Sequence, residues 1–156
     1  MPEVVQQFED LKTRVGTEVG VTDWFTIEQK MADVFGALTG NPDARHDGPA
    51  WAKTSPGGGT TAHGMNILCL IPQFGKECGL PLVASDYMYT LNYGFDRVRF
   101  TAAFRVGQRS RAHRLLDEVR KRRDDACLAK ATYSVQAENS VRPCMVAQQL
   151  SLFVMT

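Results

Sequence analysis

The spacing of apolar residues divides the chain into an N-terminal part with helical periods and a C-terminal part with strand-like periods. Apolar residues recur every three or four positions over residues 1–17, which predicts a short amphipathic N-terminal helix. Residues 19–25 are rich in β-branched and aromatic side chains and predict a strand. Thr26 and Gln29 then match a capping box, which predicts the start of a second helix that ends near Gly40.

The middle of the chain combines a loop with a strongly apolar segment. Residues 40–60 contain five glycines and three prolines, so we expect a long ordered loop there. Residues 62–76 then carry apolar side chains on nearly every face, which predicts a buried central helix. Pro72 lacks a backbone N–H, and it should kink or end this helix.

The C-terminal half is dominated by β-like segments. They lie near residues 85–93, 96–105, 109–119, 128–138 and 144–154, and charged residues 121–125 predict a hairpin turn between two of them. One buried helix followed by antiparallel strands favours a sheet wrapped around that helix, an α+β arrangement. We find no repeat, low-complexity tract or linker, so residues 1–156 are interpreted as a single domain.

Composition narrows the classes of function without selecting one. A net charge of +1 gives no global electrostatic argument for binding nucleic acid or an anionic membrane. The longest apolar run, residues 67–72, is too short to span a bilayer, and the N-terminal residues do not resemble a signal peptide. Four cysteines and three histidines lack metal-ligand spacing, so we expect free, mostly buried thiols, no metal and a cytoplasmic location.

Two motifs carry a family resemblance. Residues 39–46 read TGNPDARH and residues 58–65 read GGTTAHGM, and together they resemble the signature of the MaoC-like (R)-specific enoyl-thioester hydratases. Residues 92–100, NYGFDRVRF, are similar to a strand signature of the NodN-like branch. The resemblance runs from about Gly20 to the C-terminus, and it implies the hotdog fold, an antiparallel sheet wrapped around a central buried helix.

The resemblance also implies an activity and its partners. It points to a lyase, a hydratase or dehydratase of 2-enoyl and 3-hydroxyacyl thioesters in fatty-acid or polyketide metabolism. The substrate brings CoA or phosphopantetheine with it, so no separate cofactor is expected. We also expect a homodimer and either CoA or an acyl carrier protein as the bearer of the acyl group.

Hydration of a 2-enoyl thioester needs a base for water at C3, an acid for C2 and hydrogen-bond donors for the thioester oxygen. A histidine such as His46 suits the first two tasks near neutral pH. Backbone N–H groups at a helix N-terminus suit the third, and the resemblance assigns it to Gly64. It adds His63 and Asn92 as substrate-binding residues, and Arg97 and Arg99 as contacts to the thioester or its phosphate.

The chain departs from the family pattern beside His46. The family has an acid at the position of Asn41 and often an asparagine at the position of Asp43, so the two side-chain types are exchanged. An amide cannot act as a general base, so Asn41 can only orient water or a carbonyl. Asp43 is the remaining candidate carboxylate, although Asn41-Pro42-Asp43 also fits plain turn chemistry.

This exchange keeps three readings open. The first is hydration or dehydration, the second is addition of another nucleophile or double-bond isomerisation, and the third is thioester binding without chemistry. A hotdog thioesterase is weaker, because residues 63–76 lack the carboxylate that such enzymes commonly carry on the central helix. A set of arginines alternates with apolar residues along the predicted strands: Arg105, Arg109, Arg111 and Arg114. This pattern predicts either a solvated face or a contact surface for a CoA phosphate or an acidic carrier-protein helix. His113 lies beside these arginines in the sequence.

Overall fold

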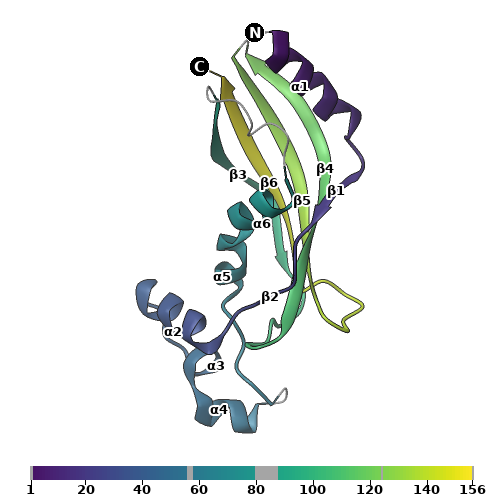
Figure 1. Ribbon diagram of the computed structural model, residues 1–156. Coiled ribbons are helices and arrows are strands. Elements are labelled where there is room, and N and C mark those ends of the chain that lie inside the picture. Colours follow the sequence, from purple (N-terminus) through teal and green to yellow (C-terminus); the bar gives the residue numbers. More distant parts are fainter. Residues whose placement is uncertain (1, 56–57, 80–87, 124, 156) are drawn as a thin grey trace.

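The computed structural model describes residues 2–55, 58–79, 88–123 and 125–155. These residues form one six-stranded antiparallel sheet with the order β1-β4-β5-β6-β3, and β2 pairs beside β1 with β4. The long strands curve together along one axis of the molecule (Figure 1). Their bounds are β1 Glu18–Val21, β2 Phe25–Thr26, β3 Met88–Phe100, β4 Arg109–Arg123, β5 Ala126–Ala137 and β6 Met145–Met155.

The helices occupy three places around this sheet (Figure 1). One lies beside the end of β4, two follow each other in front of the middle of the sheet, and three gather beyond its other end. In chain order they are α1 Pro2–Thr13, α2 Gln29–Leu38, α3 Ala44–Asp47, α4 Pro49–Thr54, α5 Gly64–Cys69 and α6 Ile71–Glu77.

The core lies between the sheet and the pair α5 and α6. Ile67 and Leu68 of α5, with Ile71 and Phe74 of α6, are buried against the inner face of the sheet. Small side chains face them from three neighbouring strands, which lets the helices approach the sheet closely: Ala112, Ala131 and Ala147. An antiparallel sheet around a buried central helical segment confirms the predicted α+β fold class.

The predicted central helix over 62–76 is wrong as one continuous element. α5 ends at Cys69, and α6 begins at Ile71 with Pro72 in its first turn, where a proline costs no intrahelical hydrogen bond. The prediction that Pro72 would kink or end the helix is therefore confirmed. The expectation of burial on nearly every face was too broad, because Met65 and Cys69 are exposed.

Three predicted features near the N-terminus also need correction. The strand predicted over 19–25 is two strands, β1 and β2, with residues 22–24 between them. The helix predicted over 1–17 ends at Thr13. The capping box is absent, because Thr26 lies in β2 and α2 begins at Gln29, with Glu28 as an N-cap that makes no side-chain bond. The Gln29 side chain instead donates to the His46 carbonyl and accepts from the Thr60 hydroxyl. The side-chain amide of Gln29, which the local pattern assigned to capping, therefore forms tertiary hydrogen bonds instead.

The remaining boundaries differ in simpler ways. The loop predicted over 40–60 contains α3 and α4. The segments predicted over 85–93 and 96–105 join as one strand, β3, which ends at Phe100 instead of residue 105 and whose register on β6 shifts near Gly94; residues 85–87 lie outside the described part. β4 extends to Arg123, so the turn over 121–125 is shorter than predicted. Among the described residues, no helix is both long and apolar enough to cross a membrane.

Candidate active site

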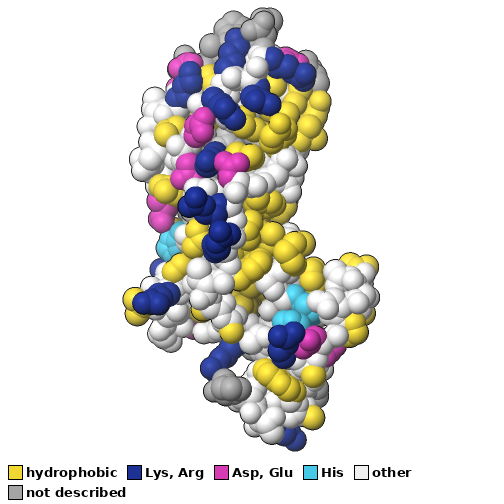
Figure 2. All heavy atoms as spheres, turned by 180° about the vertical axis from the view of Figure 1, so that it is seen from behind, with side chains coloured by type: hydrophobic (Ala, Val, Ile, Leu, Met, Phe, Trp, Pro, Cys, Tyr) yellow, Lys and Arg dark blue, Asp and Glu magenta, His cyan; other side chains and the backbone are white. Residues whose placement is uncertain are grey.

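The structure brings His46 and His63 into direct contact. His46 lies in the last turn of α3, and His63 is the residue immediately before α5. Their ring centroids are 3.7 Å apart and the ring planes are inclined by 30°. On the face shown in Figure 2, histidine atoms are visible next to basic and acidic side chains. α3, which forms within the predicted loop, thus places the motif of residues 39–46 against the start of α5.

A backbone carbonyl determines the tautomer of His46. Its Nδ1 lies 2.6 Å from the carbonyl oxygen of Thr61. A carbonyl can only accept, so the neutral ring carries its proton on Nδ1 and leaves a lone pair on Nε2. Thr61 is held in turn, because its N–H donates to the carbonyl of Arg45 at 2.9 Å. Within the described residues Nε2 has no partner, so it is available to exchange a proton with a ligand.

His63 is more deeply placed and is oriented by Asn41. Its side chain is almost fully buried, and its Nε2 lies 3.1 Å from the backbone carbonyl of Asn41. The neutral ring therefore carries its proton on Nε2, while the buried Nδ1 has no partner in the described part of the chain. Phe35 of α2 packs on the ring at a centroid distance of 5.3 Å. The buried His63 ring thus packs against the ring of His46 from the interior of the protein.

Asn41 and Asp43, the exchanged pair, contribute to the site in different ways. The side chain of Asn41 is exposed, and the residue contributes its carbonyl to His63. Asp43 is the N-cap of α3, where its carboxylate accepts from the backbone N–H of Arg45 at 2.9 Å and from the Arg45 guanidinium at 2.8 Å. The Arg45 side chain beside it holds the pKa of the Asp43 carboxyl well below its usual range. At neutral pH Asp43 is therefore an ionised capping group without a proton to donate.

Gly64 begins α5, and its missing side chain faces the chain's own Phe100. A Cβ on Gly64 would lie 2.9 Å from carbons of the Phe100 ring on β3, closer than such contacts normally come. The glycine is thus needed for packing between α5 and β3, whatever else it does. Its N–H lies in the first turn of the helix, where backbone N–H groups lack intrahelical partners.

The predicted residues of β3 lie apart from the histidine pair. Asn92 accepts a hydrogen bond of 3.3 Å from Gln149 and lines a cavity below α6. Arg97 and Arg99 are exposed, and Arg99 donates to the carbonyl of Val98. The structure therefore unites His46, His63, Asn41, Asp43 and Gly64 and leaves the three β3 residues outside that group.

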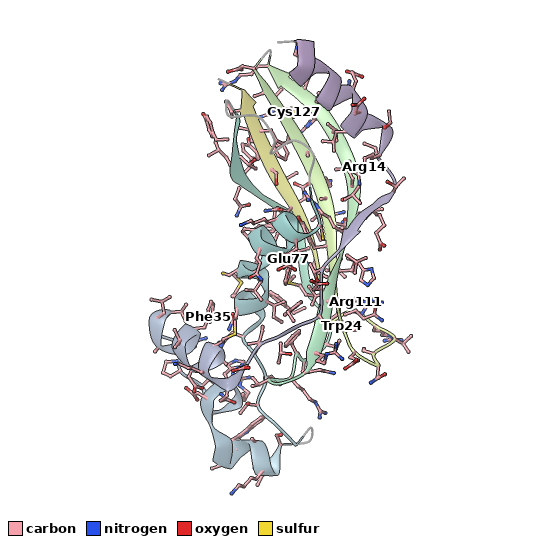
Figure 3. All side chains as sticks on the ribbon, viewed as in Figure 1. Arg14, Trp24, Phe35, Glu77, Arg111 and Cys127 are labelled. Carbon is pink, nitrogen blue, oxygen red and sulfur yellow. The ribbon has the colours of Figure 1, made fainter. Side chains whose placement is uncertain are left out.

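The arginines predicted to share one face have different environments. Arg109 pairs with Glu138 at 2.9 Å and, like Arg111, packs over the Trp24 ring. Arg111 and Trp24 lie side by side at the β2–β4 end of the sheet (Figure 3). Arg114 contradicts the solvated-face prediction, because it is only 2% exposed beneath α6. The reason is the two-residue strand period, which places Arg114 on the inner face of β4 with its buried neighbours.

His113 and the cysteines behave largely as expected. The Nδ1 of His113 lies 2.9 Å from a carboxylate oxygen of Glu18, on the opposite face of β4 from Arg114. All four cysteines are free, and Cys78, Cys127 and Cys144 are buried while Cys69 is exposed. Within the described ranges no three histidine, cysteine or acidic side chains gather as a metal site would require.

Sequence reasoning missed two contributors to the site. Gln29 joins α2 to α3 and to Thr60, and its sequence signal was visible but was assigned to capping. The Thr61 carbonyl gives no sequence signal, because any residue type supplies that group. Both act by holding His46 in place.

Solved structures with the same arrangement of elements define the class of protein. A MaoC-like dehydratase from Rhodospirillum rubrum superposes with a TM-score of 0.72 at 15% identity, covering 91% of this chain and 93% of that one. An (R)-hydratase from A. caviae gives a TM-score of 0.67 at 18% identity, covering 91% and 96%. The fold is the hotdog fold of MaoC-like proteins.

Sequence relatives define the family. Nodulation protein N of Rhizobium leguminosarum bv. viciae is 33% identical over 144 residues, 92% of this chain and 88% of the relative. The 3-hydroxyacyl-thioester dehydratase Z of Mycobacterium tuberculosis is 32% identical over 145 residues, 93% and 94% of the two chains. No family model matches the chain. At these levels of identity and coverage, the chain belongs to the MaoC/NodN-like dehydratase family.

The two carbonyl contacts predict opposite tautomers for the stacked histidines. In the neutral protein His46 should be protonated on Nδ1 and His63 on Nε2. Long-range ¹H–¹⁵N correlation spectra of the imidazoles distinguish the two forms directly, with His46→Gln and His63→Gln assigning the signals. A His46 ring protonated on Nε2 would contradict the arrangement, because the nitrogen that faces a ligand would then lack its lone pair.

Proposed function

We propose that the protein is a lyase that hydrates 2-enoyl thioesters and, in reverse, dehydrates 3-hydroxyacyl thioesters of fatty-acid or polyketide type. One observation carries the proposal: Nδ1 of His46 is occupied by the Thr61 carbonyl, so Nε2 is an available base in a fixed orientation. The membership of the family supports the substrate class, since one relative is named as a 3-hydroxyacyl-thioester dehydratase.

The available groups are sufficient for the addition of water. Nε2 of His46 takes a proton from water as the water oxygen attacks C3. The charge that develops on the thioester oxygen is met by backbone N–H groups in the first turn of α5, beginning with Gly64. The imidazolium of His46 then returns a proton to C2, so that hydrogen is added at C2 and hydroxide at C3. Dehydration follows the same steps in reverse.

Asn41 is the reason for a second candidate function. Its amide cannot exchange protons, and the neighbouring carboxylate of Asp43 is engaged as a cap and an ion pair. A site in which His46 alone is assigned to proton exchange suits reactions that need a single proton relay, such as addition of a nucleophile other than water or isomerisation of a double bond. Thioester binding without chemistry is the limiting case.

A homodimer is the assembly that we propose. β3 forms one edge of the sheet, and exposed apolar side chains line it: Tyr89, Leu91, Tyr93 and Phe100. An uncovered edge of this length and character pairs readily with another strand, and a second copy of β3 is the natural partner. Exposed Met65 and Cys69 on the outer side of α5 are further surface that a second subunit could cover.

The remaining partners follow from the substrate class. We propose that the acyl group arrives as a thioester of CoA or of a carrier protein, which share the phosphopantetheine arm, and that no further cofactor takes part. The cytoplasm is the compartment that we assign, because three buried free thiols suit a reducing environment. Burial raises the pKa of Cys127 and of Cys144 to about 11, which keeps both thiols protonated at neutral pH.

The proposed activity depends on His46. We expect His46→Ala to lower kcat for crotonyl-CoA hydration by about 10²-fold or more, because the general acid–base group is removed. The matched control is His113→Ala, which should stay within about threefold of the wild type on the same reasoning, since its partner Glu18 lies away from the site. Circular dichroism checks that both variants fold. Equal losses in the two variants would contradict the assignment of His46.

The exchanged pair provides a separate prediction. Asn41→Asp should raise crotonyl-CoA hydration, by up to about 10²-fold, because a second proton-exchanging group then divides the work with His46. Asp43→Asn is the matched variant, since asparagine also caps helices, and it should leave kcat within a few-fold of the wild type. If Asn41→Asp lowers turnover of every enoyl thioester tested, water addition is not the reaction and the second reading replaces it.

The dimer is tested by its mass. Light scattering of the dilute protein should give about twice the 17.3 kDa of the chain. Because two paired β3 edges would bury apolar surface, the dimer should persist at high salt. A single species of 17.3 kDa at all concentrations would rule the assembly out.

A further inference from the structure

The inner face of the sheet changes character along the central helices. Below α5 it is apolar, whereas below α6 it borders an open cavity of about 580 Å³ whose surface is mainly apolar and which several polar residues of the strands also line. The polar lining comes from four neighbouring strands, β3, β4, β5 and β6: Thr90, Asn92, Arg114, Tyr133, Gln149 and Ser151. Ile71 and Phe153 supply apolar wall. A cavity of this size and composition is typical of a site for a small organic ligand.

Arg114 is the unusual member of this lining. It is 2% exposed, and among the described residues its one hydrogen bond to the backbone is a long one, 3.3 Å from the guanidinium to the carbonyl of Gly75. Nε has no partner among the described residues, and no carboxylate there forms an ion pair with the side chain. A buried cation without a counter-ion is costly, so a negative group in the cavity would be strongly favoured.

Tyr133 adds a second unused donor next to the first. It lies directly opposite Arg114 on the neighbouring strand, with the guanidinium carbon 5.3 Å from its ring centroid. Its hydroxyl is buried and has no partner within the described residues. Burial raises the pKa of Tyr133 to about 12, so the hydroxyl keeps its proton at neutral pH. A Cβ on Gly75 would lie 2.9 Å from this hydroxyl, so the glycine keeps room for it beneath α6.

We propose that this cavity binds the carboxylate of a small aliphatic organic acid, with Arg114 Nε–H and the Tyr133 hydroxyl as its donors. A carboxylate fits because it accepts from a guanidinium and a hydroxyl at once, and the aliphatic part fits the wall formed by Ile71 and Phe153. The chemistry of the site is therefore recognition of charge at one end and of apolar surface at the other.

The site lies away from the reacting histidines. Its helical lining comes from α6, whereas His63 and Gly64 stand at the start of α5, the preceding helix, which places the cavity below the far part of the central helices. The carboxylate can therefore belong to a free organic acid or to the far end of an acyl chain whose thioester lies at His46. The second source rests on the proposed function, whereas the first does not.

Binding is measured directly, without turnover. Isothermal titration calorimetry of the full chain with hexanoate should give saturable binding, and 1-hexanol, which has the same chain and no charge, should bind at least tenfold more weakly. Arg114→Met should weaken hexanoate at least tenfold and Tyr133→Phe several-fold. The control Arg120→Met removes an exposed arginine that is 3.5 Å from Glu118, and it should leave binding unchanged. Equal binding of hexanoate to Arg114→Met, or no saturable binding to the wild type, overturns the proposal.

A stability measurement tests the missing counter-ion independently. Methionine is apolar and similar in length, so Arg114→Met should raise the melting temperature if Arg114 is unpaired in the free protein. If Arg114→Met instead lowers the melting temperature, Arg114 is paired within the chain and the proposal fails.

Kinetics then separate the two sources of the carboxylate. If the acid occupies the end of the acyl site, hexanoate should compete with a long-chain enoyl-CoA and not with crotonyl-CoA, whose chain is too short to reach the cavity. If the ligand is a free acid, hexanoate should bind equally with and without either thioester. Both results support the site, and a failure of catalysis alone leaves the calorimetric test unaffected.

Discussion

The packing of two short helices on the inner face of the sheet is the constraint from which the other features follow. Ile67, Ile71 and Phe74 are almost completely buried there, and each such side chain contributes about 1.5–3 kcal/mol relative to exposure. The alanines of β4, β5 and β6 make the close approach possible, since larger residues would push the helices away. The position of the helices determines where α5 begins, and with it the positions of His63 and of the first-turn N–H groups.

The same packing explains how α3 reaches the site. His63 donates to the Asn41 carbonyl, and His46 donates to the Thr61 carbonyl, so each motif orients the histidine of the other. Gln29 ties α2 to α3 across the same region. The histidine pair is therefore held by backbone groups of fixed geometry, and the arrangement tolerates the exchange of Asn41 and Asp43, because neither side chain is needed to hold the rings.

The sequence predicted the fold class because the fold class depends on patterns that survive tertiary packing. Strand periods and the apolar segment before them locate the sheet and its helix. Boundaries were less predictable, because Thr26 and Gln29 match the capping-box pattern in the sequence although Thr26 lies in β2 and the helix begins only at Gln29. The contact between His46 and His63 joins two motifs through a fold and has no local signal. The burial of Arg114 did have a local signal. Arg114 lies two residues from both Ala112 and Leu116, so it is on the same face of β4, and that face is buried.

Buried polar groups without hydrogen-bond partners lower the free energy of unfolding of the chain. In the described part of the chain, several of them lie on or against the central helices: Nδ1 of His63, Nδ2 of Asn66, Nε of Arg114 and the hydroxyl of Tyr133. Each would be replaced by an apolar group if packing were the sole requirement, because an unsatisfied polar atom costs about 1–3 kcal/mol. His63 lies at the start of the helical segment, and Arg114 and Tyr133 lie under its far half. One packed element thus separates the proposed proton-exchanging site at its start from the proposed charge-recognising site below its far half.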